Sequence, residues 1–220
     1  MEIIWYGHSC FRLSERGLAS VVTDPFDHNQ VGYEPLKLKA DIVTISHDTP
    51  GHNFVSAVKG DAYVIDGPGE FEIGGVFITG HQTNHVKKDE GELRNTLYLF
   101  DFNGINVMHL GDLNSIPTQA EVEDFGHIHI ALVPVGGGGS LNAIKATEII
   151  SLLEPKIVIP MHFATPATGN TVQQLDTIDK FLKEMGLSNI EKVPSLKIPN
   201  VSSLPDETKV VILDYQKSNN

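Results

Sequence analysis

Short apolar runs rich in β-branched and aromatic residues recur along most of this chain, and glycine, proline, aspartate or asparagine bounds each one. Runs of this kind are typical of strands and their turns. The pattern predicts strands over residues 3–6, 11–13, 21–23, 42–45, 63–65, 76–79, 97–102, 105–109, 128–134, 157–160 and 210–213. The pair Asn103-Gly104 suits a two-residue hairpin turn, so the strands on either side of it are predicted to be antiparallel neighbours.

Helix signals are fewer and lie mostly in the second half of the chain. Capping residues and stop signals predict helices over residues 118–126, 142–153 and 171–186, with a further short helix over residues 53–58. Thr118 with Glu121, and Thr171 with Gln174, have the spacing of a capping box. Residues 189–207 are predicted to be loosely structured. Because no repeat or long linker divides the chain, we expect one layered α/β domain over residues 1–220.

Charge and cysteine content narrow the classes of function. Asp and Glu total 28 against 16 Lys and Arg, a formal net charge of −12, and no basic run offsets it, so nucleic acid is not an expected partner. Cys10 is the only cysteine, which excludes an intrachain disulfide and a thiolate-rich zinc site. A metal would need histidine and carboxylate ligands. With no secretory signal and no apolar run of about 20 residues, we expect a soluble cytoplasmic protein without a membrane partner.

The placement of the histidines is the strongest chemical signal. His8, His47 and His162 each directly follow a predicted strand, and Asp112 lies three residues after the strand that ends at His109. Loops that follow strands can converge on one pocket at the edge of a sheet. His47 and His52 also flank a Pro-Gly turn, which can direct both rings at one centre. The alternative is that these are ordinary exposed loop residues, and an aspartate after glycine is often only a turn residue.

Together these segments resemble the metallo-β-lactamase superfamily, and within it the branch of L-ascorbate-6-phosphate lactonase-like zinc hydrolases. The resemblance covers residues 3–163 in the same order, through segments 5–11, 23–26, 44–47, 109–112, 133–137 and 159–162. It implies an α/β fold of the four-layer αββα type, in which two mixed sheets pack face to face with helices outside. The site would lie at one edge, where the loops after the strands meet.

The resemblance also implies a metal site whose first motif is incomplete. The family pattern His-x-His-x-Asp-His falls on His47 and His52, with Thr49 and Gly51 where the second histidine and the aspartate stand. We expect the backbone at Gly51 to tolerate aspartate poorly. The candidate metal ligands are His8, His47, His52, His85, Asp112 and His162, with His81 as the competing placement for His85. The expected cofactor is zinc, with at most one well-held ion and other divalent metals left open.

The implied activity is metal-dependent hydrolysis of a small-molecule substrate that carries an ester, a lactone or a phosphate. Asp112 and Asp48 are the candidate catalytic carboxylates, because Gly51 lacks the group that handles a proton in the family. A second interpretation is a non-catalytic relative that binds a metal or a metabolite, and a nuclease is the third. Residues 136–139, four consecutive glycines, either bind a phosphate through backbone amides or form a flexible loop beside the pocket.

Overall fold

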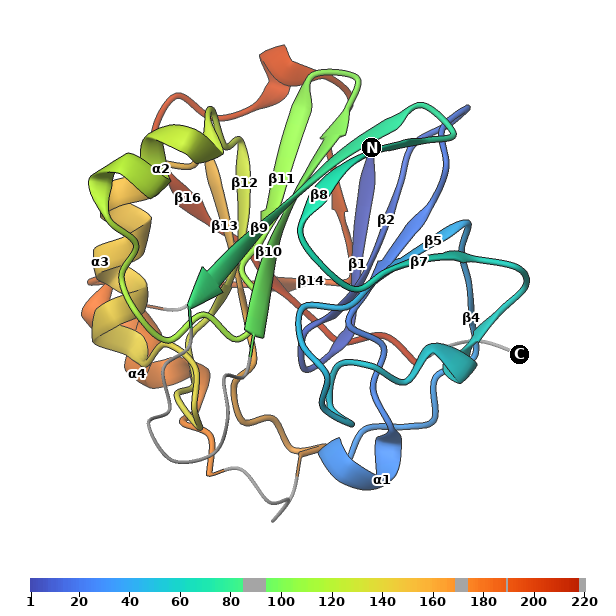
Figure 1. Ribbon diagram of the computed structural model, residues 1–220. Coiled ribbons are helices and arrows are strands. Elements are labelled where there is room, and N and C mark those ends of the chain that lie inside the picture. Colours follow the sequence, from blue (N-terminus) through green and yellow to red (C-terminus); the bar gives the residue numbers. More distant parts are fainter. Residues whose placement is uncertain (85–93, 169–173, 189, 218–220) are drawn as a thin grey trace.

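Two mixed β-sheets packed face to face form the centre of the computed structural model, which describes residues 1–84, 94–168, 174–188 and 190–217 (Figure 1). The six-stranded sheet has the order β15 (Leu196–Lys197), β1 (Glu2–Gly7), β2 (Cys10–Ser14), β3 (Val21–Thr23), β5 (Ile42–Thr44) and β7 (Tyr63–Ile65). The seven-stranded sheet has the order β16 (Lys209–Val210), β13 (Ile157–Met161), β12 (Ile130–Pro134), β11 (Ile105–His109), β10 (Arg94–Phe102), β9 (Val76–Asn84) and β8 (Gly69–Ile73).

Each sheet has a parallel half, and this half positions the loops discussed below. Strands β3, β5 and β7 are parallel to one another, as are β11, β12, β13 and β16. Two short parallel pairs lie outside the large sheets, β4 (Leu38–Lys39) with β6 (Val58–Lys59) and β14 (Lys192–Val193) with β17 (Ile212–Leu213). Parallel strands present their carboxyl ends at the same sheet edge, where ligand sites of α/β proteins commonly form.

Helices cover the two outer faces unequally. Figure 1 shows α2 (Gln119–Phe125), α3 (Ala143–Leu153) and α4 (Ile178–Glu184) together on the side of the seven-stranded sheet. On the six-stranded side, Cys10, Val22 and Val43 pack under the segment that holds the one-turn helix α1 (His28–Val31), β4 and β6. The α/β sandwich predicted from the resemblance is confirmed, with the helical layer over the six-stranded sheet reduced to α1 among the described residues.

Several predicted elements are confirmed at their predicted positions. The strands on either side of Asn103-Gly104 are antiparallel, and both turn residues have positive φ, 54° and 84°. The capping box of Thr118 and Glu121 is present at the start of α2. Asn142 accepts a hydrogen bond from Lys145 N and caps α3, which ends at Leu153.

Other predicted boundaries are wrong, because contacts distant in sequence decide them. The last helix begins at Ile178, because backbone hydrogen bonds tie Asp176 to Gly136 and Ala164 and hold residues 174–177 out of a helix. Thr171 lies outside the described residues. Residues 53–58 contain a 3₁₀ turn, Val55–Ala57, and the first residue of β6 instead of a helix, and residues 210–213 divide between β16 and β17. The stretch predicted to be loose holds β14, β15 and a second 3₁₀ turn, Val201–Ser203.

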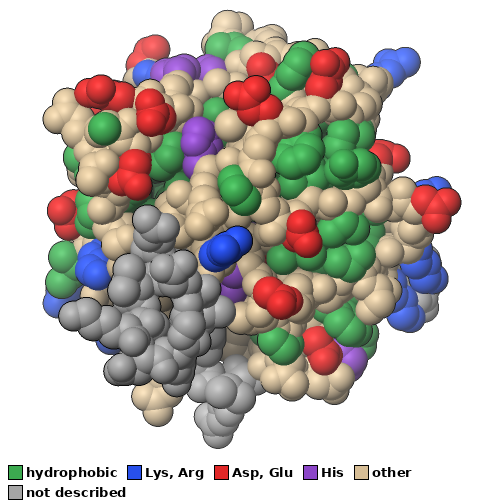
Figure 2. Space-filling view, in the orientation of Figure 1, with side chains coloured by type: hydrophobic (Ala, Val, Ile, Leu, Met, Phe, Trp, Pro, Cys, Tyr) green, Lys and Arg blue, Asp and Glu red, His purple; other side chains and the backbone are tan. Residues whose placement is uncertain are grey.

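Large apolar side chains also lie on the surface, over β7, β8 and β9 (Figure 2). Tyr63 and Phe77 are each 54% exposed, and Val64 is 40% exposed. Strands β7 and β8 are the terminal strands of their sheets, so Tyr63 and Val64 lie at a sheet edge, and Phe77 lies on β9, next to the terminal strand β8. Among the described residues, no helix has the length and apolar character needed to cross a membrane.

Candidate metal centre

Loops that follow five strands bring the predicted histidines and Asp112 together. The contributing loops carry His8 after β1, Asp24 after β3, His47 and His52 after β5, Asp112 after β11 and His162 after β13. We call His8, His47, His52, Asp112 and His162 the histidine cluster. Its members lie deep in the structure: His8, His52 and His162 are 4%, 1% and 0% exposed. The strand-end placement of these residues therefore produces one buried polar centre.

The nitrogen and oxygen atoms of the histidine cluster face one another at short distances. Asp112 Oδ2 lies 3.5 Å from Nε2 of both His47 and His52, and Asp112 Oδ1 lies 3.4 Å from His162 Nε2. His8 Nε2 lies 3.2 Å from His52 Nε2, and the His8 and His162 ring centroids are 4.3 Å apart. Two triplets have all donor atoms within 4.8 Å of one another, His8 with His52 and His162, and His47 with His52 and Asp112.

The backbone adopts an unfavourable conformation at two members of the cluster and at the neighbouring Asp24. His8, Asp24 and His162 have φ of 52°, 40° and 52°, in the left-handed region that costs on the order of 1–3 kcal/mol per residue. Local bonds hold this conformation, since the His8 carbonyl accepts hydrogen bonds from Trp5 Nε1 at 3.0 Å and from His162 N at 3.1 Å. Strain of this kind concentrates at functional sites.

Asp24 fixes the orientation of His52. Its Oδ2 lies 2.8 Å from His52 Nδ1, and its carboxylate accepts hydrogen bonds from Ser46 N at 2.7 Å and Ser46 Oγ at 2.6 Å. A proton held on Nδ1 leaves the lone pair on Nε2, which faces His8 and Asp112. Carboxylates play this orienting role for histidine ligands in metal sites. Asp24 was not among the predicted site residues, although it follows its strand directly, as His8 and His162 do.

The loops of His162 and Asp112 are held in a similar way. Ser140 Oγ donates to Gly137 O at 2.8 Å and lies 3.1 Å from His162 Nδ1, so the hydroxyl accepts the Nδ1 proton and leaves the lone pair on Nε2. Asn95 Oδ1 accepts the backbone N–H of Asp112 at 2.9 Å. The glycine run at residues 136–139 therefore supplies the partner of Ser140, which in turn orients His162.

Burial and charge set the protonation of the cluster. Burial would raise the pKa of Asp112, but the surrounding imidazoles hold it well below its usual range. Burial lowers the pKa of His8 well below its usual value and that of His47 to about 4. Burial acts in the same direction on His52, but the carboxylates of Asp112 and Asp24 outweigh it and raise that pKa. The ionised carboxylate of Asp112 and the neutral imidazoles of His8 and His47 are in the form that metal ligands need, whereas His52 has to give up a proton to a bound ion.

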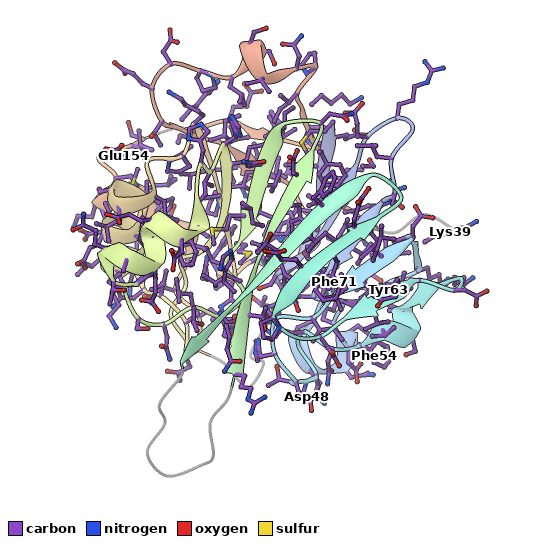
Figure 3. All side chains as sticks on the ribbon, turned by 45° about the horizontal axis from the view of Figure 1, so that its top comes forward. Lys39, Asp48, Phe54, Tyr63, Phe71 and Glu154 are labelled. Carbon is purple, nitrogen blue, oxygen red and sulfur yellow. The ribbon has the colours of Figure 1, made fainter. Side chains whose placement is uncertain are left out.

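Three other predicted positions lie elsewhere or outside the described residues. Asp48 is exposed on the loop after β5, and its carboxylate accepts a hydrogen bond from Asn53 Nδ2 at 2.6 Å (Figure 3). The structure therefore does not bring Asp48 into the cluster, because this bond holds its side chain at the surface. His85 lies outside the described residues. His81, the competing placement, packs against Phe125 of α2 with ring centroids 5.0 Å apart.

Replacing Asp24 with asparagine is expected to lower zinc affinity about 10–100-fold, the usual cost of losing the hydrogen-bond partner of a histidine ligand. Asparagine keeps the shape of the side chain but removes the charge that holds the Nδ1 proton of His52. Asp41→Asn is the matched control. Like Asp24, the Asp41 carboxylate accepts hydrogen bonds from the backbone N and the Oγ of a serine, here Ser20, but it lies at the opposite ends of β3 and β5, away from the cluster. Zinc titration against a chromophoric chelator measures both, and wild-type affinity in Asp24→Asn would contradict the expectation.

Comparisons with known proteins identify similar chains. The chain matches the β-lactamase superfamily domain over residues 2–162. It is 28% identical over 194 residues to a UPF0173 protein of Pyrococcus abyssi, covering 77% of this chain and 87% of that protein. It is 25% identical over 190 residues to a UPF0173 metal-dependent hydrolase of Thermoplasma acidophilum, covering 75% and 84%.

A solved structure gives a longer match. The structure is of a Thermotoga maritima protein described as a zinc-dependent hydrolase of the metallo-β-lactamase superfamily. This chain is 38% identical to it in sequence, and the two structures superpose with a TM-score of 0.77. The match covers 96% of this chain and 97% of that one. The names of these similar proteins do not single out the L-ascorbate-6-phosphate lactonase branch, so that finer assignment stays a prediction.

Proposed function

We propose a substrate class for this chain, which belongs to the β-lactamase superfamily domain family and is a metal-dependent hydrolase of the metallo-β-lactamase superfamily. At the histidine cluster it hydrolyses a small ester, lactone or phosphate-bearing substrate. The observation that supports this most is the meeting of four buried or partly buried imidazoles around one carboxylate, Asp112.

The residues of the cluster fit a divalent metal such as zinc. Zinc takes imidazole nitrogen and carboxylate oxygen as ligands, and the cluster offers both. Among the described residues, Asp112 Oδ1 is one of the few buried side-chain oxygens without a hydrogen-bond partner. A buried acceptor of this kind is costly unless a ligand satisfies it. A bound cation would do so.

Charge balance supports one ion rather than two. The site contains two buried carboxylates, Asp112 in the cluster and Asp24 behind His52. Their two negative charges balance one divalent ion, whereas a second ion would add two uncompensated positive charges to a buried site. Thr49 and Gly51, which offer neither an imidazole nor a carboxylate, agree with this count.

The chain's own groups have distinct roles in the proposed reaction. A bound divalent ion supplies Lewis acidity and lowers the pKa of water, so that hydrolysis proceeds near neutral pH. Asp112, whose pKa stays low, accepts a hydrogen bond from the attacking water and orients it. Asn95 fixes the Asp112 backbone, and Asp24 and Ser140 fix the rings of His52 and His162. The fixed rings keep the site pre-organised before substrate arrives.

Removal of the metal is expected to abolish hydrolysis, and added Zn²⁺ is expected to restore it. The experiment compares chelator-treated and zinc-restored protein on nitrophenyl esters, simple lactones and nitrophenyl phosphates. Asp112→Asn is expected to stay inactive after zinc is added, whereas Asp61→Asn at the exposed surface is expected to behave as wild type. Hydrolysis that survives metal removal would contradict the proposal. Protein that binds zinc but hydrolyses no substrate would instead favour the non-catalytic alternative.

A further inference from the structure

Gly51 leaves a space that His8 fills. A Cβ atom built on Gly51 would lie 3.0 Å from His8 Nε2 and 3.6 Å from His8 Cδ2, closer to this ring than to any other group around it. The expected backbone obstacle at Gly51 is wrong, because its φ lies outside the left-handed region. The obstacle to a side chain at this position is therefore the imidazole of His8.

His8 is buried within the cluster, and hydrogen bonds of its backbone hold it in place. The residue is 4% exposed, and its carbonyl is bonded to both Trp5 Nε1 and the backbone N–H of His162. Its Nε2 faces His52 Nε2, and its ring lies against that of His162. A residue 43 positions away from Gly51 along the chain thus occupies the volume of the missing side chain.

The spacing of the ligand atoms matches one tetrahedral metal centre. Bonds of ~2.0–2.1 Å at tetrahedral angles place ligand atoms ~3.3 Å apart. The distance from His8 Nε2 to His52 Nε2 is 3.2 Å, and the donor atoms of His8, His52 and His162 all lie within 4.8 Å of one another. Asp112 lies beside this triplet, with Oδ1 3.4 Å from His162 Nε2 and Oδ2 3.5 Å from His52 Nε2. The three imidazoles therefore suit three corners of such a tetrahedron, and the fourth corner stays open beside Asp112.

His47 is less suited to the same ion, because hydroxyl groups engage both of its ring nitrogens. Thr49 Oγ1 lies 3.1 Å from His47 Nε2, and Ser46 Oγ lies 3.0 Å from His47 Nδ1. Thr49, the other substituted position of the motif, therefore bonds the nitrogen that would otherwise face a metal. Each of the two substitutions has its own structural partner, Thr49 with His47 and Gly51 with His8.

We propose that His8 is a metal ligand that replaces the carboxylate absent at position 51, so that His8, His52 and His162 hold one ion and leave a position for water beside Asp112. The proposal rests on the proposed function only in requiring that the protein bind a divalent metal. It also specifies the class of metal. Three imidazoles favour zinc and neighbouring late transition metals, whereas a carboxylate in place of His8 would favour Mn²⁺ or Mg²⁺ more.

The test exchanges the two side chains. Metal-free wild type, His8→Gly, Gly51→Asp and the double variant are titrated with Zn²⁺, Mn²⁺ and Co²⁺, and Co²⁺ reports its geometry through visible absorption. Glycine at position 8 tolerates the left-handed backbone, so the metal-free fold is preserved. We expect His8→Gly to bind zinc at least about 100-fold more weakly than wild type. Losing a residue that only bonds to a ligand costs about 10–100-fold, and His8 is proposed as a ligand itself. Gly51→Asp alone is also expected to bind weakly, because the new side chain collides with His8.

The double variant is the decisive arm. Once the imidazole of His8 is removed, the carboxylate introduced by Gly51→Asp has room to supply an oxygen ligand. The double variant is therefore expected to bind zinc more tightly than either single variant and to bind Mn²⁺ relatively better than wild type does. His129→Ala, which removes a buried imidazole outside the cluster, is the matched control and is expected to bind zinc within about threefold of wild type. His47→Ala is expected to lose less zinc affinity than His8→Gly does. Wild-type affinity in His8→Gly, or a loss in His47→Ala as large as that expected for His8→Gly, would overturn the proposal. Failure of wild type itself to bind any metal would instead overturn the proposed function.

Discussion

Replacing His52 with alanine is expected to abolish zinc binding, a larger loss than for any other single residue of the cluster. His52 belongs to both triplets of close donor atoms, so among the described residues neither triplet can form without it. Its loss also leaves Asp24 buried and without its imidazole partner, and breaking a buried charged pair in this way costs about 3–5 kcal/mol. Zinc titration and urea unfolding of the metal-free protein measure the two effects separately.

Two further variants separate lost ligation from lost folding. In Asp24→Asn combined with His52→Ala, the unpaired charge is gone, so stability is expected to recover in part while zinc binding stays absent. His129→Ala removes another buried imidazole, one that accepts the Asn106 N–H outside the cluster, and is expected to leave zinc affinity unchanged. Retained tight zinc binding in a folded His52→Ala protein would show that the ion binds elsewhere.

Replacing Trp5 with alanine is expected to lower the free energy of unfolding by about 3–5 kcal/mol, the usual cost of truncating a buried aromatic side chain. Trp5 is 2% exposed, and its ring contacts those of Phe11, Tyr33, Phe163 and Tyr215. At about 2–4 °C per kcal/mol for a chain of this size, the melting temperature would fall by about 6–20 °C. Thermal and urea unfolding of the metal-free protein measure this loss.

The control for Trp5 is an aromatic residue on the surface. Tyr63→Ala is expected to change stability by no more than about 0.5 kcal/mol, because Tyr63 is 54% exposed. Trp5→Phe keeps most of the apolar contact but removes the Nε1 bond to the His8 carbonyl, so it is expected to cost less stability while still weakening the support of His8. A loss below about 1 kcal/mol in Trp5→Ala would mean that the surrounding rings close the space it leaves.

The parts of the site that sequence could indicate are those fixed by local pattern. An apolar run followed at once by a polar residue identified His8, His47 and His162, because strand ends are set by neighbouring residues. The same reasoning could not separate Asp112 from Asp48, since both are loop carboxylates and only the bond from Asn53 shows that Asp48 is held at the surface. The contact between His8 and Gly51 depends on two loops meeting in space, which no local pattern encodes.

The fold shows the same division. Strand positions and two of the helices followed from periodicity and caps, whereas the start of α4 depended on bonds from Asp176 to distant loops. Strand β8 was not predicted, because Glu70 and Glu72 alternate with only two large apolar residues in a run that begins at glycine. It forms because β9 offers it a full antiparallel partner.

The left-handed backbone at His8, Asp24 and His162 creates a trade-off between metal ligation and the stability of the fold. Glycine at position 8 or 162 would relieve backbone strain on the order of 1–3 kcal/mol, so selection for a relaxed backbone acts against keeping these ligands. Stability–function trade-offs of this kind are common where a site needs a strained conformation. A laboratory evolution campaign that rewards heat resistance alone would therefore drift toward an inert scaffold, and it would have to select for metal retention at the same time to keep the centre.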